Sequence, residues 1–136
     1  FMSEADQLIK DLQMVPHPEG GHFIECLRND DVSIIYYLLK KHEKSHWHRL
    51  TKNETLHFYK GDPLTIFTSK DGDSFSSLNI GEKNNFNFTI NAGTWFAMKS
   101  NGEYSLIGCA VVPPFDYSDF ELAPANWKPT KFNQYL

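Results

Sequence analysis

Short apolar segments separated by turn residues make up most of this chain. From His22 onward, strand-forming residues occupy nine segments: 22–28, 32–40, 45–51, 54–60, 63–69, 75–80, 86–91, 94–99 and 104–112. Clusters of Gly, Asp, Asn and Pro stand between them, as at Gly61-Asp62-Pro63, and favour turns. Many short strands joined by such turns, with no helical periodicity between them, predict an all-β fold, an antiparallel sandwich or barrel.

The two ends of the chain follow other patterns. Ser3 can cap a short helix in which Leu8, Ile9 and Leu12 share one face, and this helix is expected within residues 1–14. After residue 112 the pattern changes to mixed aromatic, acidic and proline residues, which we interpret as a C-terminal extension over 113–136. Because no linker or repeat divides the chain, residues 1–136 are predicted to form a single domain.

Charge and hydropathy indicate which kinds of binding partner the protein is not expected to have. The 136 residues include 13 Lys and Arg against 17 Asp and Glu, without a basic run, so neither a nucleic acid nor an anionic membrane is favoured as a partner. The longest apolar run, residues 34–39, is too short to span a bilayer, and no signal-peptide pattern opens the sequence. We therefore expect a soluble, cytoplasmic protein. Cys26 and Cys109 lie in strand-like segments and are expected to be buried free thiols.

The segment from His46 to Glu54 carries the most informative chemistry. Side chains alternate along a strand, so His46 and His48 are expected to share a face, and a turn over 51–53 would bring Glu54 onto the neighbouring strand. Two imidazoles and a carboxylate suit a divalent transition metal such as Fe(II), Mn(II), Ni(II) or Zn(II). The alternative is a pair of solvated or hydrogen-bonded surface histidines.

The same residues resemble a known family. His46-x-His48, Glu54 and Gly61 are similar to the first motif of the cupin superfamily, and Gly93 matches the glycine of the second motif. The wider pattern resembles the uncharacterised cupin family called DUF985 or Cupin_5 and runs through Pro18-Glu19-Gly20-Gly21-His22-Phe23, Ser33 to Leu39, Trp47-His48-Arg49, Gly61-Asp62-Pro63-Leu64 and Pro114-Phe115-Asp116-Tyr117. This resemblance covers residues 15–122 and implies a small antiparallel jelly-roll β-barrel that binds a small molecule.

Two departures from the cupin pattern affect the metal site that the resemblance implies. Five residues separate His48 from Glu54, where cupins usually have three or four, and Phe96 stands in place of the histidine of the second motif. Phe96 would give the pocket an apolar wall and remove a nitrogen donor. Two alternatives for the cofactor therefore stay open: the protein has none, or it binds a divalent transition metal.

A metal-free site would use the same side chains as acids and bases. A carboxylate beside an imidazole fixes its tautomer, so His48 with Glu54 could act as a general base, and Tyr36 or Tyr59 could supply the acid. Some cupins, the dTDP-sugar 3,5-epimerases, work in this way without a metal. Both tyrosines could equally be core or rim residues, because strand register decides which of them faces inward.

Further candidates would contact a ligand directly. Glu19, Glu25 and Arg28 match the opening motif of the family, and the guanidinium of Arg28 could bind an anionic group or form a structural pair with a carboxylate. Trp47 and Trp95 flank the two motifs and could stack on a ligand or only seal the barrel. Three functions stay open: a metal-free enzyme on a polar or sugar-like metabolite, a metal-dependent enzyme, and a non-catalytic binding or assembly module. Exposed strand edges and the aromatic tail predict a homodimer.

Overall fold

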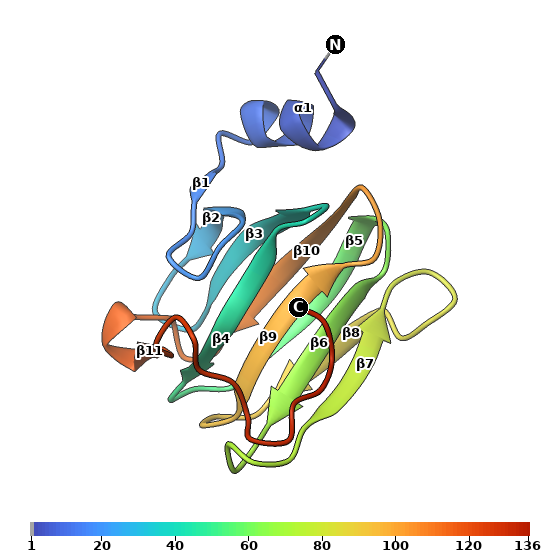
Figure 1. Ribbon diagram of the computed structural model, residues 1–136. Helices are drawn as coiled ribbons and strands as arrows, with labels where there is room; N and C mark the ends of the chain where they lie inside the picture. Colours follow the sequence, from blue (N-terminus) through green and yellow to red (C-terminus); the bar gives the residue numbers. More distant parts are fainter. Residues whose placement is uncertain (1) are drawn as a thin grey trace.

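A computed structural model describes residues 2–136 and shows two antiparallel sheets packed face to face (Figure 1). The first sheet has the order β1 (Val15–Pro16), β2 (His22–Arg28), β3 (Ser33–Lys40), β10 (Tyr104–Val111), β5 (Glu54–Gly61) and β8 (Asn87–Ile90). The second has the order β11 (Phe120–Leu122), β4 (Lys44–Leu50), β9 (Trp95–Ser100), β6 (Leu64–Ser69) and β7 (Ser76–Ile80). Phe1, which the single domain predicted over 1–136 includes, lies outside the described residues.

The predicted all-β jelly-roll fold is confirmed, with one correction. Each of the nine predicted segments forms a strand whose ends differ from the prediction by no more than one residue. The sheets do not close into the expected barrel, because the described strands pair within two separate sheets and form a sandwich. The prediction also lacks β1 and β11, which are two and three residues long and too short for alternation to reveal.

The main core lies between the two sheets. It is built from the inward side chains of both, with Tyr37, Leu39, Leu56 and Ile107 from the first sheet facing residues such as Phe96 from the second. The alternation along each strand produces this arrangement, because every second side chain points to the same face. The core therefore fixes the positions of the polar side chains that alternate with it on the inner faces.

Two further layers cover the outer faces. The helix α1 (Glu4–Asp11) begins after Ser3, whose side chain accepts a hydrogen bond from the Asp6 amide at 3.1 Å, as predicted. It packs on the first sheet through a cluster that includes Ala5 and Leu38. The C-terminal residues 123–136 run over the second sheet (Figure 1) and bury Phe132. Within residues 2–136, no helix is long and apolar enough to cross a membrane.

Bulges change the face of several side chains. Between Ser45 and His48, β4 advances three residues while β9 advances two, from Met98 to Phe96. A second bulge leaves Tyr59 as an extra residue of β5, since Phe58 and Lys60 face adjacent residues of β10. A third leaves Cys26 as an extra residue between Glu25 and Leu27 of β2. Each bulge reverses the alternation beyond it.

The bulge in β2 corrects one prediction about the thiols. Cys26 is exposed, contrary to the expectation of a buried thiol, and its Sγ lies 3.3 Å from the Ile34 carbonyl oxygen. Cys109 on β10 is buried, as expected, and both cysteines are free.

Candidate functional site

A cavity of about 330 Å³ lies between the inner face of the first sheet and the segment that follows β10. Its polar walls come from six elements: the loop before β2, β2 itself, the start of β3, the start of β5, β10, and the chain after β10. The polar and ionisable lining residues are His17, Glu25, Arg28, Ser33, Glu54, Cys109, Asp116 and Tyr117. Phe23, Ile35, Val111 and Phe115 complete the wall. A cavity of this volume suits a small ligand.

The loop between β1 and β2 carries His17 and Glu19 to the inner face. Gly20 and Gly21 have φ angles of 111° and 74°, which favour glycine, and a Cβ on Gly20 would collide with the Lys44 carbonyl. The loop can therefore lie directly against β4, where the His46 amide donates to the Glu19 carbonyl at 2.8 Å. The glycine pair thus sets how close Glu19 comes to the second sheet.

Glu19 lies between two imidazoles. Its Oε1 is 3.4 Å from Nδ1 of His17 and 3.4 Å from Nε2 of His48, while the Ser45 hydroxyl donates to Oε2. Glu19 is 9% exposed and His48 is 1% exposed, so neither reaches bulk water. Polar side chains from the loop and from β4 therefore meet in one buried cluster.

The hydrogen bonds of the two imidazoles determine their tautomers. Nδ1 of His48 lies 2.7 Å from the His46 carbonyl, which only accepts, so Nδ1 carries the proton and Nε2 presents a lone pair to Glu19. Nδ1 of His17 accepts from the Glu19 amide at 3.1 Å, which leaves the ring proton of neutral His17 on Nε2. Both nitrogens that face the Glu19 carboxyl are therefore acceptors.

Burial also controls the charge of this cluster. It lowers the pKa of His48 to about 4 and lowers that of His17, although the neighbouring Glu19 partly opposes the second shift. Burial raises the pKa of Glu19. Burial therefore disfavours the charged form of all three groups in this cluster.

Glu54 forms a second polar group of the cavity. It begins β5, and its buried side chain lines the cavity together with Cys109. The pKa of Glu54 is raised from 4.5 to about 8, mainly by burial and also by the charge of Glu19, while a hydrogen bond with Cys109 opposes the shift. Burial also raises the pKa of the Cys109 thiol. At neutral pH the cavity therefore holds a mainly protonated carboxyl beside a neutral thiol.

The expected metal ligands do not come together. His46 turns away from the cavity, with Nε2 at 2.9 Å from the Pro124 carbonyl, because the bulge in β4 gives the inward position to Ser45. His48 and Glu54 face inward, but the prediction that His46 joins them is wrong. No three His, Cys, Asp or Glu side chains in residues 2–136 form a group that fits a metal ion. The donor set of a 2-His-1-carboxylate site is thus not assembled.

The two tyrosines predicted as acids lie on the outer face of the first sheet. Tyr36 packs edge to face against Tyr59 at 6.0 Å, and Tyr59 is 49% exposed. Gly108 leaves the space that the Tyr59 ring occupies. Their predicted position in the cavity is wrong. The inward tyrosine is Tyr37, which is 2% exposed and donates its hydroxyl hydrogen to the Gly20 carbonyl.

Of the predicted ligand contacts, Glu25 and Arg28 line the cavity. They also form the structural pair that was the alternative, with Nε and Nη2 of Arg28 each 3.0 Å from Glu25. Trp47 and Trp95 instead lie in the outer cluster beneath the C-terminal residues, because their strand positions point away from the cavity. Their predicted place at the site is therefore wrong.

Phe96 lies inward, as predicted, although it is not among the residues that line the cavity. Its ring centroid is 4.0 Å from that of His48, and the two residues are register partners across β4 and β9. Phe96 is completely buried. It therefore forms an apolar wall behind the imidazole of His48 and shields that ring from water.

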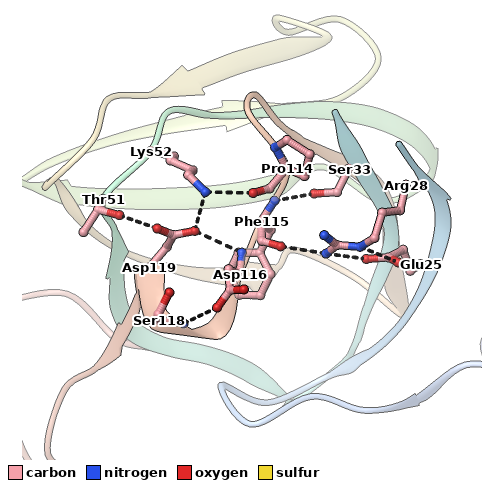
Figure 2. A network of polar contacts seen from close by, with 10 residues as sticks. All are labelled: Glu25, Arg28, Ser33, Thr51, Lys52, Pro114, Phe115, Asp116, Ser118 and Asp119. Carbon is pink, nitrogen blue, oxygen red and sulfur yellow. Dashed lines mark hydrogen bonds and ion pairs between the residues drawn. The ribbon is translucent and has the colours of Figure 1, made fainter. Parts of the chain in front are cut away.

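Residues 113–119, which include the 3-10 helix η1 (Tyr117–Asp119), form a cap segment over the cavity (Figure 2). Nζ of Lys52 donates to the Pro114 carbonyl at 2.8 Å and to Asp119 at 2.7 Å. On the other side, Arg28 donates to the Phe115 carbonyl at 2.6 Å, and the Phe115 amide donates to Ser33 at 2.8 Å. These contacts hold the cap segment between the two sheets.

Sequence reasoning missed His17 as a site residue. His17 packs edge-on against Phe23 at 4.6 Å, and its ring lines the cavity. The available signal was its position in Pro16-His17-Pro18-Glu19-Gly20-Gly21, a loop whose prolines and glycines fix the backbone beside two ionisable residues.

Comparisons with known proteins agree with the fold. A hypothetical protein from Leishmania major is 30% identical, with a TM-score of 0.79 over 89% of this chain and 88% of its own. A Shewanella oneidensis protein is 33% identical, with a TM-score of 0.84 over 90% of this chain and 85% of its own. Both therefore match this chain over nearly their whole length.

More distant structures share the fold alone. The capsular polysaccharide assembling protein CapF from Staphylococcus aureus is 17% identical, with a TM-score of 0.66 over 80% of this chain and 33% of its own. Oxalate decarboxylase from Lactobacillus farciminis is 14% identical, with a TM-score of 0.65 over the same shares. No curated protein sequence matches the chain. The sequence model of Cupin_5, described as cupin superfamily (DUF985), matches residues 6–123, and the chain therefore belongs to this family.

Proposed function

We propose that this chain is an enzyme that moves a proton next to the carbonyl group of a small, polar, sugar-like metabolite, as isomerases and epimerases do. The observation that carries the proposal is the pairing of two ionisable groups in one cavity, Glu54 and His17, whose pKa values burial moves in opposite directions. Groups separated in this way are typical of acid–base sites.

Each group has a distinct role in this reaction. The Glu54 carboxylate, with a pKa of about 8, is a stronger base than an ordinary carboxylate and takes the proton from carbon. Neutral His17 carries its ring proton on Nε2 and donates it to the carbonyl oxygen. Only the ionised fraction of Glu54 can act as the base, so activity is expected to rise with pH up to about 8.

Nε2 of His17 is accessible for this donation. Nε2 of His17 forms no hydrogen bond within the described part of the chain. Nevertheless, the buried side-chain nitrogen or oxygen atom that lacks a partner in that part is Nδ1 of His22. Nε2 of His17 is therefore not among the buried atoms without a partner, and His17 itself lines the cavity. A ligand carbonyl can therefore approach it.

The test is hydrogen exchange into D₂O. The protein is incubated with a panel of aldoses and ketoses, and the C–H signal beside the carbonyl is followed by proton NMR. Exchange above the buffer rate is expected for at least one sugar, with a loss of about 10²–10⁴-fold in Glu54→Gln. Glu103→Gln, at a side chain 82% exposed, is the matched control and should retain the wild-type rate.

Two results would contradict the proposal. One is the absence of protein-dependent exchange for every aldose and ketose in the panel. The other is exchange that persists unchanged in Glu54→Gln. A sugar that binds, seen as shifted protein resonances, but does not exchange would identify a non-catalytic binding module instead.

We also propose a homodimer. The strands β7 and β8 each have a hydrogen-bonded neighbour on one side, and Phe86 beside β8 is 60% exposed. Edges of this kind can pair with a second copy. Gel filtration at micromolar concentration is expected to give twice the 15.7 kDa mass of one chain, and a single-chain mass would contradict the proposal.

A further inference from the structure

We propose that Glu19 is a proton-relay residue behind His17: it passes a proton to Nδ1 of His17 while Nε2 of His17 gives its own proton to the ligand. This inference rests on the proposed function of the cavity and deepens it. A neutral imidazole that donates a proton would otherwise become an imidazolate. A group that gives a proton to Nδ1 during the same step keeps the imidazole neutral, so no imidazolate forms.

The contacts of Glu19 differ from those of a structural carboxylate. A structural carboxylate would accept hydrogen bonds from N–H groups, but both imidazole nitrogens at 3.4 Å from Oε1 carry lone pairs in the tautomers that the His46 carbonyl and the Glu19 amide impose. The contact is favourable when Oε1 carries a proton. Because the same oxygen faces both nitrogens, that proton can turn from His48 toward His17.

The transfer conserves protons and charge. Before the step, Glu19 is protonated, His17 carries hydrogen on Nε2, and Glu54 is ionised. During the step, Glu54 takes the proton from carbon, the carbonyl oxygen takes the Nε2 proton, and Nδ1 takes the Glu19 proton in place of the hydrogen bond that it accepts from the Glu19 amide. Afterwards Glu54 is protonated, His17 carries hydrogen on Nδ1, Glu19 is ionised, and the ligand is a neutral enediol. The reverse transfer completes an isomerisation or epimerisation.

The surroundings of Glu19 can hold its negative charge. The Ser45 hydroxyl donates to Oε2 of Glu19, and this hydrogen bond favours the ionised carboxylate. The other ionisable groups that act on this cluster are His17, His48, His46 and, in the cavity, Glu54. Glu19 and Glu54 repel each other when both are ionised, which favours one negative charge shared by the two carboxyls.

In this account His48 is a positioning residue. Its Nδ1 is fixed on the His46 carbonyl at 2.7 Å, and its ring stacks against Phe96 at 4.0 Å between centroids. The neutral ring therefore cannot present an N–H to Glu19 without losing the bond to His46. In the resting state Nε2 of His48 accepts the hydrogen bond from the protonated Glu19 carboxyl. This hydrogen bond is lost when the proton moves to His17.

The test reads the ring protons directly, without a substrate. Protein labelled with ¹⁵N at histidine is studied by long-range ¹H–¹⁵N NMR at pH 7, in the wild type, in Glu19→Gln and in the control Glu103→Gln. We expect the Nδ1–H tautomer for His48 and the Nε2–H tautomer for His17. Glu19→Gln should shift the His48 Nε2 and His17 Nδ1 resonances, and Glu103→Gln should leave both in place.

The relay and the proposed function fail separately. An Nε2–H tautomer of His48, or imidazole resonances that do not respond to Glu19→Gln, would overturn the relay whatever the activity. Sugar exchange that is lost in Glu54→Gln but kept in Glu19→Gln would also overturn it while leaving the proposed function intact. Absence of exchange in the wild type would overturn the proposed function, and the NMR result would still decide the proton arrangement.

A second variant covers a failure of Glu19→Gln to fold. Ser45→Ala keeps the carboxyl but removes the hydroxyl that donates to its ionised form. The resting tautomers of both histidines should stay as in the wild type, and sugar exchange should slow roughly tenfold. An unchanged rate of sugar hydrogen exchange in Ser45→Ala would contradict the proposal that Glu19 becomes ionised during the step.

Discussion

Oε1 of Glu19 lies 3.4 Å from Nε2 of His48, and both side chains are buried between the sheets. The loop carrying Glu19 and the strand carrying His48 are therefore joined by a polar contact inside an otherwise apolar core. Such a contact is costly to break from one side, because the remaining polar groups stay buried without partners.

Glu19→Ala should therefore destabilise the fold. It removes the partner of the Ser45 hydroxyl and of His48, and each unsatisfied buried group costs about 1–3 kcal/mol. We expect the free energy of unfolding in urea to fall by on the order of 2–4 kcal/mol. Glu103→Ala, at an exposed carboxylate, should change it little. Equal stability of the two variants would contradict the buried contact.

Glu54 should make stability depend on pH. Its pKa is raised from 4.5 to about 8 in the folded protein, so between these values the folded chain holds a proton that the unfolded chain has lost. Stability from this group is complete below about pH 4.5 and is lost as pH rises toward 8. Thermal unfolding from pH 5 to 8 should show this decline in the wild type and a smaller decline in Glu54→Gln. The same slope in both proteins would rule out an elevated Glu54 pKa.

The cap segment should depend on Lys52. Its Nζ donates to the Pro114 carbonyl and to Asp119, and the two side chains are 24% and 13% exposed. Lys52→Met should lower the free energy of unfolding by about 1–3 kcal/mol and speed amide exchange in residues 115–119. Lys131→Met breaks the exposed pair with Asp73 and should cost less than about 1 kcal/mol. Similar losses in both variants would argue against a specific role for Lys52.

The C-terminal residues should stabilise the second sheet through Phe132. Its ring lies 5.2 Å from Trp47 and 5.0 Å from Phe67, and the residue is 7% exposed. Phe132→Ala is expected to cost about 3–5 kcal/mol in chemical denaturation. Tyr135→Ala changes an aromatic residue of the same tail that is 87% exposed, and its cost should be small. A minor effect of Phe132→Ala would mean that the tail is loosely attached in solution.

The longer strands of this fold could be predicted because each is long enough for its hydrophobic pattern to show, whereas β1 and β11 are too short. The faces of the site residues could not, because some of them depend on bulges. Ser45 takes the inward position that alternation gives to His46, because of the bulge in β4. Tyr37, in place of Tyr36, faces the core by regular alternation along β3, but alternation alone does not say which of its two faces is the inner one. A bulge arises from the pairing of two strands, and neither strand contains it alone.

The carboxyl that contacts His48 could not be predicted from the sequence either. Alternation and a hairpin predicted Glu54, but the carboxyl 3.4 Å from His48 belongs to Glu19, which lies in the irregular loop between β1 and β2. Only the close approach allowed by Gly20 and Gly21 makes that contact possible. The two glycines and the histidine between prolines marked the loop as special without showing what it reaches.

The central claim is that the cavity keeps Glu54 protonated beside a neutral imidazole. Its most direct measurement is a ¹³C NMR titration of the glutamate side-chain carboxyls from pH 4 to 10, with the Glu54 resonance assigned from its absence in Glu54→Gln. The Glu54 carboxyl is expected to titrate with a midpoint near pH 8. A midpoint near pH 4.5, the ordinary value for a glutamate, would contradict it.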